Sequence, residues 1–349
     1  MFGLFKSAKP HTLTIEGVGE FTVNPKETIL TAALRQGVRF PYSCKVGGCA
    51  TCKCKLQDGQ VKELTSSAFI LSSEDLDNKY ILGCQSQLKS DVTVFVDGLS
   101  DGTSVADVQE GEITAIEKLT ADMVSVTVTL PEETTYVPGQ YVLFSTPAVS
   151  SGARSYSFAT PPQGNQVRFF IREVPGGEMS GWANHRAVVG DKVTIDGPYG
   201  DFYLRQDSAD KRGGEMLMIA GGSGIAPVLA ILEDAMNHKI DRDVTFLFGA
   251  RTEKDLCALE DISRISRNWS GRFRFIPVLS EEPEGSSWDG RRGLVTDVIP
   301  ELTDITQTYM CGPPPMLDAA ESCLKELGMS TNGIYCDRFT DRSHAKKAG

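Results

Sequence analysis

Apolar and polar positions alternate in several short stretches at the start of the chain, and this period of two is typical of half-buried β-strands. Residues 28–36 change to helical spacing and stop at Gly37, a residue type that often ends helices. The pattern predicts a small mixed sheet with one packed helix, similar to a β-grasp, over residues 1–99, with residues 1–10 as an extension. Its strands are expected at residues 12–15, 20–23, 53–56, 80–82 and 92–96.

A second region consists of short strand-like runs separated by Pro and Gly turns. Residues 100–111 come before it, are rich in Asp, Gly and Ser, and show no apolar period, so we expect a solvated linker there. Residues 112–212 then predict an antiparallel β-barrel domain. Its strands are expected at residues 112–117, 123–130, 141–145, 155–159, 167–174 and 192–196.

From residue 213 the pattern becomes strand, Gly-rich turn, helix and strand. A buried apolar run at 215–220 is followed by helical spacing at 225–237 and by a second apolar run at 244–248. This order predicts a parallel α/β domain over residues 213–340, with residues 341–349 as a tail. The whole chain is therefore expected to be a multidomain α+β protein.

The composition is ordinary for a globular protein, with 40% hydrophobic and 23% charged residues among 349. The formal net charge is −11, and no dense Lys/Arg tract is present, so a nucleic-acid partner is not expected. No apolar run reaches the roughly 18 residues of a membrane span. Residues 1–10 are too short for a secretory signal, and a cytoplasmic location is expected.

The cysteines carry the first chemical signal. Cys44, Cys49 and Cys52 have the spacing C-x4-C-x2-C, and Cys84 follows after a strand-rich stretch. This is the plant-type arrangement for a 2Fe-2S cluster, and the small residues between the cysteines suit a loop that wraps closely around sulfur. A structural zinc site and reduced core cysteines are the alternatives. The spacing gives Cys54 no role as a ligand, and we interpret it as a packing residue.

Two motifs in the predicted barrel suit a flavin. Arg154 can bind a diphosphate, Tyr156 can stack on an aromatic ring, and Ser157 offers a hydroxyl to a ring nitrogen. Gly177 and Ser180 lie at an expected helix start, where backbone amides can bind phosphate. Each motif alone is weak evidence, because an isolated strand or Gly-rich turn is common.

Three unusual turns follow strands of the predicted α/β domain. The first comprises Gly221, Gly222, Ser223, Gly224, Ile225, Ala226 and Pro227, and it lacks the G-x-G-x-x-G spacing of the Rossmann fingerprint. The second ends at Arg251. The third comprises Cys311, Gly312, Pro313 and Pro314. Turns at the carboxyl ends of parallel strands meet at one edge of a sheet, so they predict a single binding edge for a dinucleotide.

The order of these motifs, closed by Asp337 and Phe339, resembles the NADH-dependent reductase components of bacterial multicomponent oxygenases, most of all the xylene monooxygenase type. These are plant-type ferredoxins fused to a module similar to ferredoxin-NADP reductase, and the resemblance covers residues 11–340. It implies an NADH:acceptor oxidoreductase that passes electrons through FAD and a 2Fe-2S cluster to a terminal oxygenase acting on an aromatic or other hydrocarbon.

The resemblance also implies roles for individual residues. Asp337 and Ser157 are candidates for hydrogen bonds at the flavin edge, Cys311 should reach the nicotinamide, and Phe339 should cover the flavin face opposite Tyr156. The remaining motif residues are implied ligands. The cluster ligands are Cys44, Cys49, Cys52 and Cys84; FAD is held by Arg154, Tyr156, Ser157, Gly177 and Ser180; and NADH lies along residues 221–227, Arg251 and residues 311–314.

Other interpretations remain open at this point. The chain could be an electron carrier or redox-sensing module without turnover, or a reductase for a partner that is not an oxygenase. Acidic residues after Arg251 favour NADH over NADPH. Lys45, Lys53 and Lys55 near the cysteines predict an acidic surface on the protein partner. Membrane contact is expected only through that partner or through residues 1–10.

Overall fold

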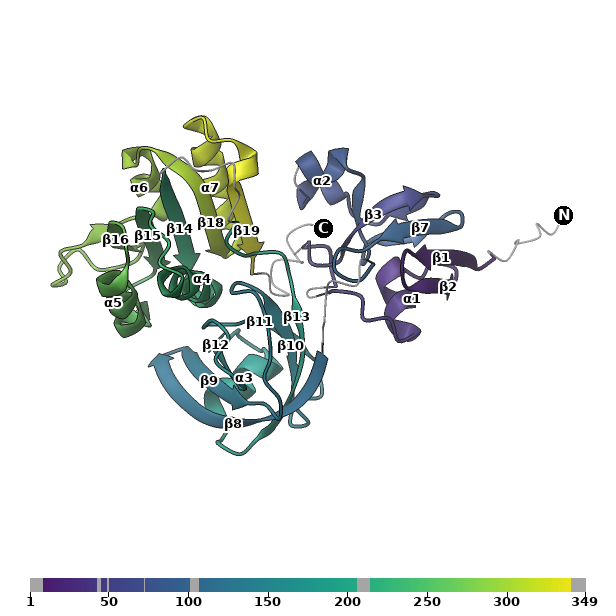
Figure 1. Ribbon diagram of the computed structural model, residues 1–349, viewed down its shortest axis with the longest axis horizontal. Helices are drawn as coiled ribbons and strands as arrows, with labels where there is room; N and C mark the ends of the chain where they lie inside the picture. The colour runs from purple at the N-terminus through teal and green to yellow at the C-terminus, as the bar shows by residue number, and fades with distance from the viewer. Residues whose placement is uncertain are drawn as a thin grey trace. The chain divides into compact units, whose positions relative to one another are not determined.

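The computed structural model of the chain describes residues 9–42, 45–48, 50–71, 73–100, 107–205 and 214–339. These residues form two compact units, one over residues 9–100 and one over residues 107–339. Figure 1 shows a mixed sheet with one main helix in the first unit, and a barrel joined to an α/β layer structure in the second. The expected tail and two of the expected cluster ligands, Cys44 and Cys49, lie outside the described residues.

The first unit is a five-stranded mixed sheet packed against helix α1 (Ile29–Arg35). Its strands are β1 (His11–Ile15), β2 (Gly19–Val23), β3 (Lys53–Asp58), β5 (Tyr80–Leu82) and β7 (Val92–Phe95), in the spatial order β2, β1, β7, β3, β5. Strands β1 and β7 are parallel, and the other neighbours are antiparallel. The mixed sheet with one packed helix that the alternation predicts is confirmed. Smaller elements are β4 (Val61–Glu63), β6 (Ser86–Leu88), η1 (Ser67–Phe69) and α2 (Ser73–Asp77).

Local chemistry explains where α1 begins and what it packs against. The Thr28 side-chain oxygen accepts the N–H of Thr31 at 3.2 Å and so caps the helix. Leu13, Ile29 and Phe40 are each at most 1% exposed in the core between α1 and the sheet. Burying one such side chain stabilises the fold by about 1.5–3 kcal/mol. Cys54 is completely buried in the same core.

The second unit begins with a six-stranded antiparallel sheet in the order β11, β10, β13, β8, β9, β12. A backbone bridge between Phe158 and Phe169, with the Ala159 N–H donating to Arg168 O at 2.8 Å, nearly closes it into a barrel. Phe144 and Phe169 are fully buried inside. The elements are β8 (Asp107–Thr120), β9 (Met123–Thr129), β10 (Tyr141–Ser145), β11 (Arg154–Ser157), β12 (Gln166–Arg172), α3 (Glu178–His185) and β13 (Lys192–Tyr199).

The linker prediction is wrong for residues 107–111. Strand β8 begins at Asp107 and pairs with β13 in an antiparallel register from Glu112 opposite Lys192 to Asp107 opposite Gly197. Most side chains of residues 107–110 are exposed, so no apolar period marks this strand. Backbone hydrogen bonds to β13 hold it, and such bonds leave no signature in the order of side chains.

The carboxyl-terminal part is a six-stranded parallel sheet in the order β17, β16, β15, β14, β18, β19. Its strands are β14 (Glu215–Gly221), β15 (Val244–Ala250), β16 (Phe273–Leu279), β17 (Arg291–Arg292), β18 (Ile305–Gly312) and β19 (Ile334–Arg338). Its helices are α4 (Ile225–Asn237), α5 (Leu259–Asn268), α6 (Val295–Val298) and α7 (Pro314–Glu326), with short turns η2 (Gly222–Gly224), η3 (Glu253–Asp255), η4 (Ile299–Glu301) and η5 (Thr331–Gly333).

Helices cover both faces of this parallel sheet. Helices α4 and α5 pack on one face, and α6 and α7 pack on the other (Figure 1). The chain proceeds from β14 outward through β15, β16 and β17, and then returns to place β18 on the other side of β14. This reversal of strand order next to β14 is the position where open α/β sheets bind ligands, at the carboxyl ends of the strands.

Candidate functional site

Two of the expected cluster ligands lie side by side in the first unit. Cys52 directly precedes β3 and Cys84 follows β5, its neighbouring strand. The Cys84 N–H donates to Cys52 Sγ at 3.4 Å, and the Gln85 side-chain amide donates to Cys84 Sγ at 3.6 Å. Both thiols are at most 6% exposed. Buried sulfurs that accept N–H bonds fit an iron-sulfur cluster, because such bonds stabilise the charge on coordinated thiolates.

The loop before Cys52 has the backbone conformation that close wrapping requires. Lys45, Gly47 and Ala50 all have positive φ, at 59°, 77° and 57°. A Cβ at Gly47 would lie 2.6 Å from Cγ of Gln85, so only glycine lets the loop approach this closely. The small residues of the loop therefore fit the predicted cluster.

The lysines near the cluster loop are less cationic as a group than the sequence indicates. Lys53 Nζ lies 3.2 Å from Asp75 Oδ1, which compensates its charge. Lys45 Nζ lies 4.3 Å from the centre of the Tyr42 ring. Of the three lysines in the predicted positive patch, Lys53 thus has its charge balanced within the fold.

On the flavin side, one turn joins the two expected phosphate-binding elements. Arg154, the first residue of β11, donates from Nη1 to the carbonyls of Ser151, Gly152 and Ala153 at 2.9–3.2 Å. Glu178, the first residue of α3, accepts the N–H groups of Ser150 and Ser151 at 3.2 and 3.1 Å. These hydrogen bonds hold the Arg154 guanidinium and the start of α3 against the same turn, an arrangement that fits a diphosphate.

Along strand β11, Tyr156 points to one face and its neighbours Ser155 and Ser157 point to the other. The Tyr156 ring packs edge-on against Phe144 with centroids 5.8 Å apart, and burial raises the pKa of its phenol. Ser157 is 5% exposed. Ser155 Oγ is buried and has no hydrogen-bond partner among the described residues, so it can serve a bound group.

The Ser180 hydroxyl bonds to the backbone of its own turn. Its Oγ accepts the N–H of Val174 at 3.0 Å and donates to Gly177 O at 3.4 Å. The hydroxyl therefore holds the turn before α3. A contact between Ser180 and phosphate is left to its backbone N–H, which lies in the first turn of the helix.

The two Gly-rich turns of the parallel sheet pack directly on each other. A Cβ at Gly224 would lie 2.3 Å from the carbonyl oxygen of Cys311, and one at Gly221 would lie 2.8 Å from Met316. Gly222, at φ 56°, begins η2 at the end of β14. At Gly224 only glycine permits this backbone contact at the strand-order reversal, and the resulting backbone cradle fits a dinucleotide.

Cys311, Asp337 and Phe339 meet beside that cradle. Cys311 and Asp337 are paired neighbours on β18 and β19, and the Phe339 N–H donates to Gly312 O at 2.9 Å. Cys311 is fully buried, which raises the pKa of its thiol. Burial, with the charge of Asp201 as the next cause, raises the pKa of the Asp337 carboxyl to about 7.

The raised pKa of Asp337 makes stability depend on pH. In the folded chain this carboxyl keeps its proton up to about pH 7, against an ordinary value of 3.8. Its contribution to stability is complete below pH 3.8 and is lost as the pH rises through 7. We expect the urea midpoint of Asp337→Asn to fall less between pH 5 and pH 8 than that of the wild type. Equal falls in the two proteins would contradict the assignment.

Arg251 is held in a network that the sequence did not predict. Its Nη2 donates to Asp122 at 3.2 Å and to Asp255 at 2.9 Å. Asp122 also accepts from Arg172 Nε at 3.0 Å, and Arg172 Nη1 lies next to Gly222. Neither Asp122 nor Arg172 belongs to a motif, and the alternation of β12 marks Arg172 only as a partly exposed position.

Comparison with known families covers all three parts of the chain. Residues 13–89 match the 2Fe-2S iron-sulfur cluster binding domain, residues 110–203 match the oxidoreductase FAD-binding domain, and residues 218–322 match the oxidoreductase NAD-binding domain. A ferredoxin unit, a flavin barrel and a nicotinamide sheet on one chain define the class of iron-sulfur flavoprotein reductases.

Individual proteins similar to this chain indicate which iron-sulfur flavoprotein reductases it resembles. The xylene/toluene monooxygenase electron transfer component of Pseudomonas putida is 41% identical over 97% of both chains. The reductase component of phenol 2-monooxygenase from Pseudomonas sp. strain CF600 is 32% identical over 94% of both chains. The crystal structure of an Amycolatopsis cytochrome P450 reductase has a TM-score of 0.73 at 31% identity and covers 95% of this chain and 99% of its own. The ferredoxin reductase in carbazole 1,9a-dioxygenase has a TM-score of 0.69 at 28% identity over 95% and 99%.

The chain belongs to the family of reductase components of multicomponent oxygenases. The resemblance seen in the sequence and its expected fold are thereby confirmed. The protein is an NADH oxidoreductase that uses FAD and a 2Fe-2S cluster to supply electrons to an oxygenase component. Within the described residues, no helix is long and apolar enough to cross a membrane.

Proposed function

We propose that the second unit takes a hydride from NADH and that the first unit delivers single electrons to a terminal oxygenase acting on an aromatic or other hydrocarbon. Bound FAD supplies the chemistry between them, because a flavin accepts two electrons together and releases them one at a time. This proposal rests on one junction in the second unit. There the Gly224 backbone contacts the carbonyl of Cys311, and the Phe339 N–H donates to Gly312 in the same turn. The names of the xylene/toluene and phenol monooxygenase relatives support the hydrocarbon class.

In this proposal the barrel holds FAD. Arg154 and the backbone N–H of Ser180 bind its diphosphate. The N–H of Gly177 donates to Val174 O at 2.8 Å, so Gly177 contributes close backbone approach and not a donor. Tyr156 stacks on one face of the flavin ring and Phe339 covers the other. Ser157 donates a hydrogen bond at the ring edge.

The parallel sheet holds NADH along its cradle, which is formed by Gly221, Gly222, Ser223, Gly224, Ile225, Ala226, Pro227, Gly312, Pro313 and Pro314. Cys311 packs beside the position of hydride transfer, and Asp337 holds a proton at the flavin edge. Arg251 binds NADH while its guanidinium is held by Asp122.

Cys44, Cys49, Cys52 and Cys84 hold the cluster, and the surface with Lys45, Lys53 and Lys55 faces an acidic patch of the oxygenase component. Because NADH is the donor, we place the reaction in the cytoplasm. The test is to combine the purified chain with the hydroxylase component of the xylene/toluene monooxygenase of P. putida and to follow NADH-dependent hydroxylation. Product formation supports the hydrocarbon class. NADH oxidation with ferricyanide but no product would reject this recipient while leaving the reductase chemistry intact.

Replacing Phe339 by serine should change how nicotinamide reaches the flavin. Once the ring no longer has to be displaced, we expect a KM for NADH about 3- to 10-fold lower, and a lower kcat because the nucleotide leaves more slowly. Phe339→Tyr keeps the ring and should keep wild-type kinetics. Steady-state and stopped-flow measurements decide, and unchanged kinetics in Phe339→Ser would make Phe339 a simple packing residue.

NADH should be preferred over NADPH. At the ends of β15 and β16 the Glu282 carboxylate accepts the N–H of Glu253 at 2.8 Å, and Arg251 is paired with Asp255. A 2′-phosphate placed there meets acidic groups, and one such contact costs more than about 1.4 kcal/mol, or tenfold in affinity. We therefore expect kcat/KM for NADH to exceed that for NADPH at least ~10-fold. A higher kcat/KM with NADPH would contradict this account.

A further inference from the structure

One carboxylate holds two guanidinium groups beside the dinucleotide turn. Arg172 donates from Nε and Arg251 donates from Nη2 to the same oxygen, Oδ2 of Asp122, at 3.0 and 3.2 Å. The other oxygen, Oδ1, accepts the hydroxyl of Thr120 at 3.0 Å. Asp122 and Arg172 belong to the barrel and Arg251 to the parallel sheet, so Asp122 links the two domains of the second unit at this point.

The hydrogen bond to Asp122 fixes which nitrogens of the Arg172 guanidinium face the turn at Gly222. Since Nε is bonded to Asp122, the terminal nitrogens extend beyond it, and Nη1 lies 2.8 Å from the position that a Cβ at Gly222 would take. Gly222 opens η2, where strand β14 ends. A guanidinium fork next to backbone N–H groups at such a turn matches the geometry of a diphosphate.

The two arginines held by Asp122 do not simply add positive charge to the turn. Arg251 also donates to Asp255 at 2.9 Å, so two arginines are balanced by two aspartates. The binding free energy of an anion at this turn therefore depends on where the two guanidinium groups are held. Asp122 is the residue bonded to both of them.

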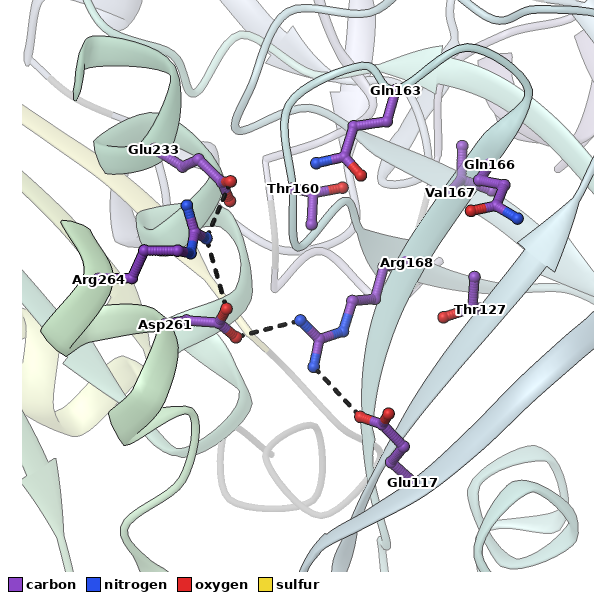
Figure 2. A pocket seen from close by; sticks show the side chains of 10 residues that line it. All are labelled: Glu117, Thr127, Thr160, Gln163, Gln166, Val167, Arg168, Glu233, Asp261 and Arg264. Atoms are coloured by element: carbon purple, nitrogen blue, oxygen red, sulfur yellow. Dashed lines mark hydrogen bonds and ion pairs between the residues drawn. The ribbon is translucent and has the colours of Figure 1, made fainter. Parts of the chain in front are cut away.

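A second arginine on β12 shows what an ordinary ion pair across this interface looks like. Arg168 precedes Arg172 by four residues and pairs with Asp261 of α5 at 3.1 Å. Figure 2 shows this pair beside a polar hollow of about 430 Å³, where Arg168 also reaches Glu117 and Arg264 joins Asp261 to Glu233. None of the residues lining this hollow belongs to the Gly-rich turns. Asp261 is therefore a matched control for Asp122.

We propose that Asp122 is a positioning residue for the nicotinamide dinucleotide, holding Arg172 and Arg251 so that both bind its diphosphate as it passes Gly222. The inference rests on the proposed function, because it requires the dinucleotide to lie along this turn.

The test is Asp122→Asn in the FAD- and cluster-loaded protein, with binding of ADP-ribose measured by titration calorimetry. ADP-ribose carries the diphosphate and lacks the nicotinamide. We expect its affinity to fall about tenfold, and the KM for NADH to rise about tenfold with kcat changed less than about twofold. Removing a negative charge without a loss of geometry would tighten anion binding, so the sign of the change separates positioning from simple electrostatics.

Asp261→Asn breaks the comparable pair, leaves Arg168 with Glu117 and Arg264 with Glu233, and should bind ADP-ribose like the wild type. Asp122→Glu, which keeps the charge, should recover part of the affinity. Unchanged or tighter binding in Asp122→Asn, or an equal loss in Asp261→Asn, would overturn the role of Asp122. Failure of the wild type itself to bind ADP-ribose or oxidise NADH would instead reject the proposed function.

Discussion

Replacing Cys52 by serine is expected to stop electron delivery to the protein partner while sparing the reaction with NADH. Cys52 lies next to Cys84 in the first unit, and the flavin and nicotinamide motifs lie in the second. Loss of one thiolate ligand should lower NADH-dependent reduction of the oxygenase component at least ~100-fold. NADH oxidation with ferricyanide, which accepts electrons from the reduced flavin, should change less than about twofold.

Cys54→Ala is the matched control, because Cys54 lies on β3 two residues after Cys52 and is fully buried in the core. We expect this variant to keep the cluster absorbance and partner reduction, with a loss of stability of about 1–2 kcal/mol. Iron and acid-labile sulfide analysis accompanies both variants. If Cys52→Ser keeps its cluster, or if Cys54→Ala loses it, the ligand assignment is wrong.

The second large effect is expected at Gly224, whose replacement by alanine should prevent productive binding of NADH. A Cβ there would lie 2.3 Å from the Cys311 carbonyl, and neither backbone can yield without moving the other. Displacement of a reacting group by about 1 Å can lower a rate about 100-fold, so we expect kcat/KM for NADH to fall by about that factor. FAD content should remain at the wild-type level, because the barrel motifs are untouched.

Gly285→Ala provides the comparison, since no atom of the described residues lies within 4 Å of the Cβ that it adds. This variant should keep wild-type kinetics and change stability by less than about 0.5 kcal/mol. Steady-state kinetics and the flavin absorbance of both variants are the measurements. Normal kcat/KM in Gly224→Ala would show that the contact between the two turns is not required for hydride transfer.

Much of the fold could be predicted because it follows from local patterns. Period-two alternation marks the strands of the first unit, and buried runs followed by Gly-rich turns mark the parallel sheet. The first part of β8 could not be predicted, because its exposed side chains carry no period and only pairing with β13 makes residues 107–111 a strand.

Some residues of the candidate site could likewise be predicted from the sequence, and others could not. Motif residues such as Gly224 and Cys311 are visible in the sequence because close backbone contact permits few residue types. Asp122 and Arg172 are invisible there, since their roles arise from contacts between residues far apart in the chain. The charge of Lys53 is misjudged from sequence for the same reason, because Asp75 approaches it only in the folded chain.

Electrons should pass from NADH to FAD and from there to the 2Fe-2S cluster. The decisive measurement mixes the loaded protein with NADH in the absence of oxygen and follows flavin absorbance and the electron paramagnetic resonance of the cluster over time. We expect flavin bleaching to precede the signal of the reduced cluster, and Cys52→Ser to show only the bleaching. A reduced cluster that forms without prior flavin bleaching, or flavin bleaching in the wild type with no reduced-cluster signal, would contradict this electron path.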